Sequence, residues 1–294
     1  MALWETRIEI SPEAAEAVGT ALLEAGCGAW TVVEDAVAAR AWIVGVFGSP
    51  EEAKSRWDEL RKGLPVAPAA APSTRLLPDV DWRNSYREHF RAWTFGRLHW
   101  VPVWERASFR LPAGHSVLWL DPGLAFGTGN HETTRLCIER LVEFEGTLRG
   151  GASGLRMADA GCGSGILALS ASLLGFGSVR GFDNDPEAVR VSLENARLNG
   201  LEGRVRFETA GLPGGLAGAP FDFVAANVQA DVLVGYADAL ASAVAPGGTL
   251  AMSGILASEA ASVKARFAGA APGWAPESRV LGQWCDLCLR RPLH

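Results

Sequence analysis

Ala158-Asp-Ala-Gly-Cys-Gly-Ser-Gly165 decides the fold of the larger part of this chain, because it places a glycine-rich turn between a predicted strand and a predicted helix. The strand is the largely apolar run Leu155–Ala158, and the helix is Ile166–Leu174. The three glycines let the backbone turn sharply and approach a ligand. Asp183 ends the next apolar run, where a carboxylate can accept both hydroxyls of a ribose. The pattern predicts a loop that binds a nucleotide-like cofactor.

The spacing of the glycines separates two classes of cofactor. Dinucleotide enzymes prefer Gly-x-Gly-x-x-Gly, in which the third glycine allows close packing over a pyrophosphate. This chain has the tighter Gly-x-Gly-x-Gly. That spacing suits S-adenosylmethionine, which has no pyrophosphate, and favours a methyltransferase over a nicotinamide enzyme.

Composition bounds the class of protein. The chain has 294 residues, 48% of them hydrophobic, but no run approaches the roughly 20 apolar residues of a membrane helix. The amino terminus lacks the order of a signal peptide, so we expect a cytoplasmic protein without a membrane. A formal charge of −6 argues against direct nucleic-acid binding and is compatible with a basic protein partner.

The five cysteines do not predict a disulfide framework, because their number is odd and their spacing irregular. Cys285-Asp-Leu-Cys288 lies in a strand-like segment, where residues three apart point to opposite faces. The two thiols cannot chelate together there. We therefore predict strand packing and no metal site.

Residues 1–78 predict a small α+β domain of ferredoxin-like type, with the order strand, helix, strand, strand, helix, strand. A cap residue followed by proline opens each helix, at Ser11-Pro12 and at Ser49-Pro50. The predicted strands are Leu3–Ile10, 29–33, 41–47 and 74–77.

Residues 79–109 are predicted to be a helical linker. Aromatic side chains recur there at helical spacing, at Trp82, Tyr86, Phe90 and Trp93. Arginines lie between them, and this is the most basic stretch of the chain.

Residues 110–294 alternate strand and helix, which predicts a doubly wound, Rossmann-like parallel sheet. Helices are expected from Asp185-Pro186 to Asn199-Gly200, over 230–244 and over 258–268. Arg279–Arg290 reads as two strand-like runs with a tight turn, hence an antiparallel pair at the sheet edge. This ending is typical of class I methyltransferases, whose seven-stranded sheet has an antiparallel last strand.

Several motifs together resemble one family, the bacterial ribosomal protein L-11 methyltransferases (PrmA). The resemblance covers the chain from about Trp82 to Cys285, and the pattern of residues 1–78 agrees with the substrate-recognition domain of that family. The motifs are Phe126-Gly-Thr-Gly-Asn-His-Glu-Thr-Thr134, Gly161-Cys-Gly-Ser-Gly-Ile-Leu-Ala168, Asp183-Asn-Asp-Pro186, Asn195-Ala-Arg-Leu-Asn-Gly200 and Ser253-Gly-Ile-Leu-Ala257.

The resemblance implies an enzyme that uses S-adenosylmethionine to trimethylate lysine side chains and the terminal amine of ribosomal protein L-11. It implies cofactor contacts at Thr134, Gly161, Asp183 and Asn227, and the loop geometry adds Gly163. Asn227 is also expected to position the target amine. The family usually has Asn-Ile-Leu-Ala where this chain has Asn227-Val-Gln-Ala230, so a glutamine enters near the expected amine entrance.

The chemistry needs no nucleophilic side chain, because the methyl group of a sulfonium is already activated. A base is optional, and His131 is expected to be a helix cap or lid contact instead. Cys162 is expected to fill the loop. Two alternatives stay open: a protein-lysine methyltransferase with another protein substrate, and a nucleotide-cofactor oxidoreductase or scaffold. Only residues 1–78 could separate the first alternative from the L-11 enzyme.

Overall fold

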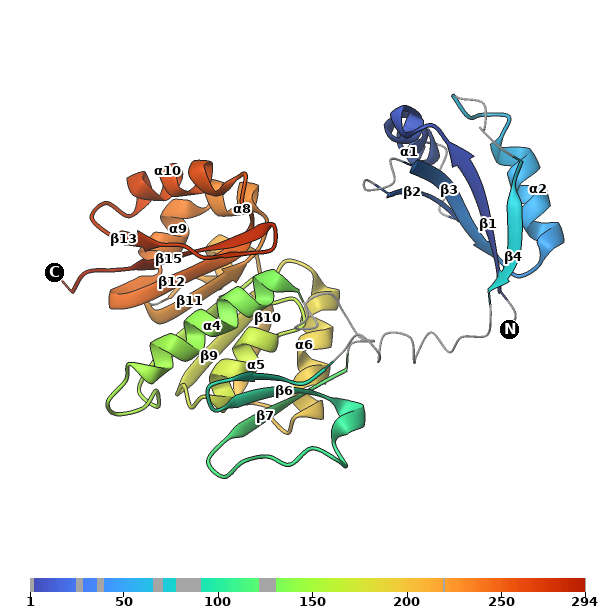
Figure 1. Ribbon diagram of the computed structural model, residues 1–294. Helices are drawn as coiled ribbons and strands as arrows, with labels where there is room; N and C mark the ends of the chain where they lie inside the picture. The colour runs from blue at the N-terminus through green and yellow to red at the C-terminus, as the bar shows by residue number, and fades with distance from the viewer. Residues whose placement is uncertain are drawn as a thin grey trace. The chain divides into compact units, whose positions relative to one another are not determined.

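The structure is a computed structural model that describes residues 3–24, 29–35, 40–65, 71–77, 91–121, 131–218 and 220–293. The chain divides into two compact units, Met1–Tyr86 and Arg87–His294 (Figure 1). The division falls inside the predicted linker 79–109. Trp82, Tyr86 and Phe90 of the predicted aromatic helix lie outside the described residues.

The first unit has the predicted ferredoxin-like topology. Its antiparallel sheet has the order β2-β3-β1-β4. The structure gives the bounds β1 Leu3–Ile10, α1 Ala15–Glu24, β2 Trp30–Asp35, β3 Arg40–Phe47, α2 Pro50–Leu60 and β4 Ser73–Leu77. A short 3-10 helix, η1, covers Pro12–Ala14 before α1.

Helix α2 begins where its sequence predicts. The Ser49 hydroxyl accepts the Glu52 backbone N–H at 3.1 Å, and the Glu52 carboxylate accepts the Gly48 N–H at 3.0 Å. This reciprocal capping fixes the helix start. The helix then buries Trp57 against Trp30, with ring centroids 6.0 Å apart, in a core cluster that belongs to this unit alone.

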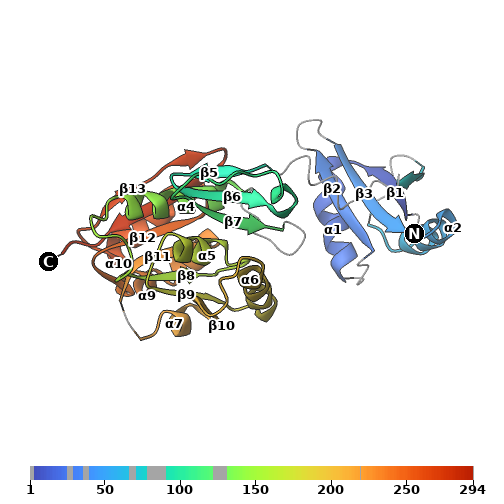
Figure 2. The same cartoon turned by 90° about the horizontal axis from the view of Figure 1, so that it is seen from below.

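The helical linker predicted for residues 79–109 is wrong over its described part. Strand β5 (Trp93–Phe95) pairs antiparallel with β6 (Leu98–Pro102), and β6 pairs parallel with β7 (Ser116–Leu120). Figure 2 shows these three strands side by side. All five residues of β6 are buried, and the Trp100 indole N–H donates to Ser170 Oγ at 2.9 Å. Burial of these strands in the apolar core of the second unit favours strands here over the local helical spacing.

The second unit contains the predicted doubly wound sheet, in the order β10-β9-β8-β11-β12-β15-β13. The first five strands are parallel, and β15 is antiparallel to β12 as predicted. The sheet has eight strands because β13 and β14 both pair with β15. The bounds are β8 Arg156–Ala160, β9 Ser178–Asp183, β10 Val205–Thr209, β11 Phe221–Asn227, β12 Val244–Leu256, β13 Ala275–Glu277, β14 Val280–Leu281 and β15 Trp284–Arg290.

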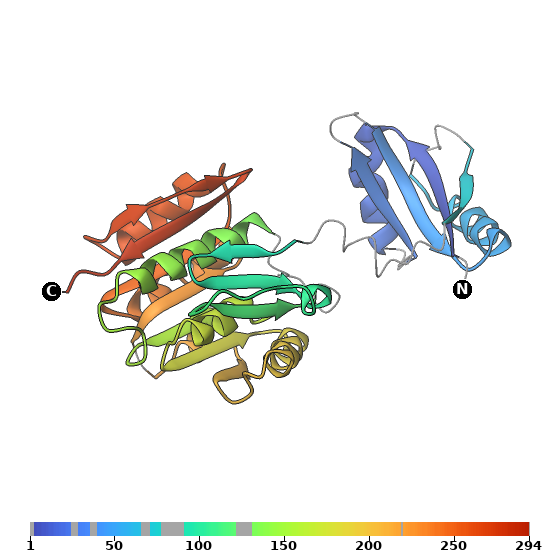
Figure 3. The same cartoon turned by 60° about the horizontal axis from the view of Figure 1, so that its bottom comes forward.

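Helices cover both faces of this sheet, with α4 and α10 on opposite sides (Figures 1 and 3). The helix expected over 230–244 is two helices, because the backbone leaves helical geometry at Tyr236 (φ −111°, ψ 18°). The helices are α4 Glu132–Gly146, α5 Ile166–Leu173, α6 Pro186–Leu198, α7 Leu212–Gly215, α8 Ala230–Gly235, α9 Ala237–Ser242 and α10 Ala260–Ala270. Within the described ranges, none of the helices is both long and apolar enough to span a bilayer.

Cys285 and Cys288 both lie in β15, as predicted, and both are buried. Cys285 packs in the apolar cluster that contains residues of α8, α9 and α10. The strand-packing interpretation of this segment is confirmed.

Candidate functional site

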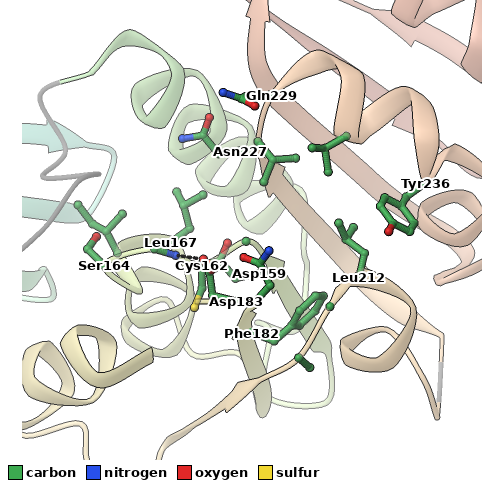
Figure 4. A pocket seen from close by; sticks show the side chains of 18 of the residues that line it. Asp159, Cys162, Ser164, Leu167, Phe182, Asp183, Leu212, Asn227, Gln229 and Tyr236 are labelled. Atoms are coloured by element: carbon green, nitrogen blue, oxygen red, sulfur yellow. Dashed lines mark hydrogen bonds between the residues drawn. The ribbon is translucent and has the colours of Figure 1, made fainter. Parts of the chain in front are cut away.

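A cavity of about 540 Å³ opens at the carboxyl ends of β8, β9 and β11 (Figure 4). Ligands bind at this edge of a doubly wound sheet because the loops after the strands converge there. The structure brings all the sequence-predicted site residues to this one cavity, although they come from four separate stretches of chain. They are Thr134, Gly161, Gly163, Asp183 and Asn227.

The glycine loop forms the floor of the cavity, and its backbone requires glycine. Gly161 has φ +74°, and a Cβ built there would lie 2.4 Å from Val228 Cγ1. Gly163 has φ +51°. A side chain at Gly161 would therefore force apart the loop and the turn after β11.

Strand β9 holds this loop through backbone and side-chain bonds. The N–H groups of Gly161 and Cys162 both donate to the Phe182 carbonyl, at 2.9 and 3.0 Å. The Asp183 carboxylate accepts the N–H groups of Gly163 and Asp185, both at 3.0 Å. Asp183 is thus fixed in position, and each of its oxygens has a lone pair left for a ligand.

Helix α6 supplies two contacts to the loop that the sequence analysis missed. The Ser192 hydroxyl donates to the Gly163 carbonyl at 2.8 Å, and the Asn195 amide donates to the Ser164 carbonyl at 2.9 Å. The signal was present, because polar residues three apart share one face of a helix. Asn195 lies in one of the quoted motifs.

Asp159 is the buried carboxyl beneath the loop. It is 1% exposed and accepts the Ala168 N–H at 3.0 Å, at the start of α5. Burial raises the pKa of Asp159 to about 7; the Ala168 hydrogen bond opposes this shift and the negative charge of Asp183 adds to it. The site therefore contains a carboxyl group that titrates near neutral pH.

The opposite wall joins β11 to α4. The Asn227 amide donates to Thr134 Oγ1 at 3.2 Å. Helix α4 is held in place by Arg140, whose buried guanidinium bonds Asp286 of β15 at 2.6 Å and Glu277 of β13 at 2.9 Å. The hydrogen bond leaves the Asn227 carbonyl oxygen available to accept from a ligand.

One end of the cavity is apolar. Phe182, Leu212 and Tyr236 lie on one side of it (Figure 4), and Asp183 is bonded to the glycine loop through the Gly163 N–H. Flat apolar surfaces next to a carboxylate suit a purine joined to a ribose. The sequence analysis did not find these residues, because they come from three separate stretches of chain, in β9, after β10 and after β11.

His131 and Cys162 are not reactive groups of this site. His131 caps α4 by accepting the Thr133 N–H at 3.4 Å, and its ring packs 5.0 Å from that of Trp284. The preceding residues 122–130, which include the start of the Phe126–Thr134 motif, lie outside the described residues. Cys162 is buried, and burial raises the pKa of its thiol far above the ordinary value. Its thiol therefore fills the loop, as expected.

The comparisons with known proteins agree on one family. The family model for ribosomal protein L11 methyltransferase (PrmA) matches residues 2–292. The chain is 39% identical to the ribosomal protein L11 methyltransferase of Azotobacter vinelandii over 280 residues, which cover 90% of this chain and 92% of that protein. The corresponding protein of Chloroflexus aurantiacus is 35% identical, with 98% of each chain covered.

A solved structure is also similar. The ribosomal protein L11 methylase of Lactobacillus delbrueckii subsp. bulgaricus superposes with a TM-score of 0.59 at 29% identity. The match covers 69% of this chain and 100% of that chain.

Proposed function

Because the chain belongs to the ribosomal protein L11 methyltransferase family, we propose that it transfers methyl groups from S-adenosylmethionine to amines of ribosomal protein L11. Methyltransferase activity follows from the family. The proposal adds the acceptor, which is the lysine side chains or the amino-terminal amine of that protein.

One observation carries the proposal: the glycine loop, a fixed carboxylate, an apolar end and a free amide carbonyl all face a single cavity. The cavity volume of about 540 Å³ is suited to one ligand of nucleoside size. The loop passes so close to Val228 that a Cβ at Gly161 would clash, so at this residue backbone faces the cavity. These features fit an adenosine with a short amino-acid chain.

Different residues of the cavity would bind different parts of the cofactor. Asp183 would accept the ribose hydroxyls through the lone pairs that its two backbone N–H bonds leave free. The apolar end at Leu212 and Val232 would hold the adenine. Gly161 and Gly163 would let the backbone approach the methionine portion, and Thr134 would fix Asn227.

The chain would act on the target amine by positioning it for the transfer. S-adenosylmethionine, when bound, supplies an electrophilic methyl group, so the chain must align the amine nitrogen with it. Alignment of this kind can contribute roughly 7–11 kcal/mol. A lysine must first lose a proton to solvent, which costs about 4–5 kcal/mol at pH 7. The Asn227 carbonyl would accept an N–H of the neutral amine and so direct its lone pair.

We assign protein recognition to the first unit and transfer to the second. All the cavity residues lie in the second unit, and the first unit has a core of its own. Because every described residue that lines the cavity belongs to the second unit, the first unit is the part of the chain to which we assign contact with the protein substrate.

The test is label transfer from methyl-labelled S-adenosylmethionine to unmethylated ribosomal protein L11, with mass spectrometry to locate the methyl groups. We expect methyl groups on lysine or on the terminal amine. The matched control is the same protein with its amines already blocked by acetylation, which should take up no label. Label on arginine or histidine, or equal label in the blocked control, would contradict the proposal.

A further inference from the structure

Helix α6 supports the glycine loop from outside the cavity. Ser192, Asn195 and Asn199 lie on one face of this helix, because they are three and four positions apart. Ser192 and Asn195 are both buried. No residue of α6, all of which the structure describes, lines the cavity. These side chains therefore act on the loop and not directly on a ligand.

Two successive carbonyl groups of the loop are bonded to this helix. The Ser192 hydroxyl donates to the Gly163 carbonyl at 2.8 Å, and the Asn195 amide donates to the Ser164 carbonyl at 2.9 Å. Gly163 and Gly165, on either side of Ser164, both have positive φ angles. Because glycine adopts positive and negative φ angles about equally readily, the sequence of the loop does not by itself fix these peptide planes. The bonds from α6 fix them.

Helix α6 is in turn fixed to a strand. The Asn199 carboxamide accepts the Trp119 N–H at 2.7 Å and donates to the Trp119 carbonyl at 3.0 Å, as the backbone of a paired strand would. It also donates to the Asn195 carbonyl at 2.9 Å. Strand β7 thus supports the turn of α6 from which Asn195 reaches the loop. The motif Asn195-Ala-Arg-Leu-Asn-Gly200 contains one amide for the loop and one for the strand.

We propose that Ser192 and Asn195 are positioning residues that fix the glycine loop for the amino-acid end of S-adenosylmethionine. The inference rests on the proposed function, which places the methionine portion of the cofactor against Gly161 and Gly163. It adds the origin of selectivity for that portion: the two bonds from α6 determine the affinity for the amino-acid chain and leave the affinity for the adenosine unchanged.

The physical reason is the direction of the peptide dipoles. Bonding to α6 keeps the carbonyl oxygens of Gly163 and Ser164 on the side of the helix, which does not line the cavity. Without these bonds, rotation of either peptide plane would turn a partly negative oxygen toward the carboxylate of the amino-acid chain. Charges of the same sign repel each other strongly where water is excluded. The two bonds therefore prevent an orientation of the loop that disfavours the cofactor.

The adenosine part is bound by groups that do not depend on these two bonds. The Asp183 carboxylate accepts the N–H groups of Gly163 and Asp185. The Gly163 N–H belongs to the peptide between Cys162 and Gly163, which precedes the two peptides that α6 holds. Asp183 should therefore keep its position when a bond from α6 is removed.

The experiment uses calorimetry on the full-length chain with two ligands, S-adenosylhomocysteine and methylthioadenosine. The second ligand carries the same adenosine without the amino-acid chain. Ser192→Ala and Asn195→Ala should each weaken binding of S-adenosylhomocysteine about fivefold, which corresponds to one hydrogen bond of about 1 kcal/mol. Binding of methylthioadenosine should not change. Arg197→Ala is the matched control, because the exposed side chain of Arg197 on the same helix pairs with Glu202, and both affinities should stay as in the wild type.

The ratio of the two affinities separates positioning from a general structural role, which would weaken both ligands alike. Thermal unfolding is measured for each variant. Ser192→Ala removes a single oxygen atom, so it provides the test even if Asn195→Ala does not fold. Equal weakening of both ligands, or no weakening of either, would overturn the inference and leave the proposed function intact. Failure of the wild-type chain to bind S-adenosylhomocysteine would overturn both.

Discussion

The small sheet of the first unit and the carboxyl edge of the large sheet treat carboxylates in opposite ways. On the first sheet Glu9 pairs with Arg40 at 2.9 Å on the face opposite the helices, where both side chains are in contact with water. At the edge of the large sheet Asp159 is 1% exposed and accepts the backbone N–H of Ala168. The same chemical group is thus solvated in one unit and desolvated in the other.

The difference indicates which region of the chain gives up folding stability for a functional site. A solvent-exposed ion pair contributes little and can be lost cheaply. A buried carboxyl and a loop of left-handed glycines are unfavourable for folding unless another task requires them. The cavity of the second unit therefore has the properties of a reaction site, and the first unit has those of a stable scaffold that presents a surface.

The largest effect should come from filling the glycine loop. Gly163→Val adds a branched side chain at φ +51° against the cavity, so binding of S-adenosylhomocysteine measured by calorimetry should be lost. Gly203→Val is the matched control, because Gly203 also has a positive φ but does not line the cavity. Retained binding in Gly163→Val would place the cofactor elsewhere and remove the contrast between the units.

The next largest effect should be on the pH dependence of the free energy of unfolding. The folded pKa of Asp159 is about 7, above its ordinary value, so its protonated form stabilises the fold at low pH and this contribution is lost as pH rises through 7. Asp159→Asn keeps the acceptor for the Ala168 N–H. Relative to wild type, the variant should gain about 2–3 kcal/mol in urea unfolding between about pH 5 and pH 8. Parallel pH profiles would mean that Asp159 is not desolvated.

A smaller effect is expected at the ribose carboxylate. Asp183→Ala removes an acceptor that would bind hydroxyls and should weaken cofactor binding about tenfold to a hundredfold, the range for hydrogen bonds to a charged group. Calorimetry with S-adenosylhomocysteine measures this change. Asp185→Ala, which removes the exposed cap of α6, serves as the control and should leave the affinity nearly unchanged. Equal losses in both variants would assign Asp183 a structural role only.

The smallest effect belongs to the first unit. The hydrogen bond from Arg40 lowers the pKa of Glu9 below its ordinary value. Any stabilisation of the fold by this pair is therefore present at pH values above the ordinary pKa of a glutamate, and it is lost as the pH falls through the lowered pKa of the folded state. Because the Glu9–Arg40 pair is in contact with water, which screens it, Glu9→Gln should not measurably change the urea midpoint at pH 7 or at pH 4. A clear loss at pH 7 that vanishes at pH 4 would show that this surface pair supports the fold.

Local signals predicted much of the fold. The strand β1 and the starts of α2 and α6 agree with the structure, because alternation and cap-proline pairs act within a few residues. The strands β5 and β6 were mistaken for helix, since their burial depends on β7 and α5 further along the chain. The break at Tyr236 and the division of the sheet edge into β13 and β14 likewise carry no local sequence signal.

The site shows the same limit. Thr134, Asp183 and Asn227 were found from motifs, and the structure brings them to one cavity while their roles remain proposals. The contacts of Ser192 and the desolvation of Asp159 were not found, because each depends on tertiary packing around the loop. The sequence therefore predicted several residues of the cavity, but it did not predict the hydrogen bonds and the burial that hold and perturb them.

The central claim is the division between recognition and transfer, and truncation tests it most directly. A chain that begins near Asp79 keeps every cavity residue and should bind S-adenosylmethionine as the full chain does. It should methylate a short lysine peptide weakly and fail to methylate folded ribosomal protein L11. If the truncated chain methylated intact ribosomal protein L11 at the rate of the full chain, the first unit would not be the recognition domain and the account would be contradicted.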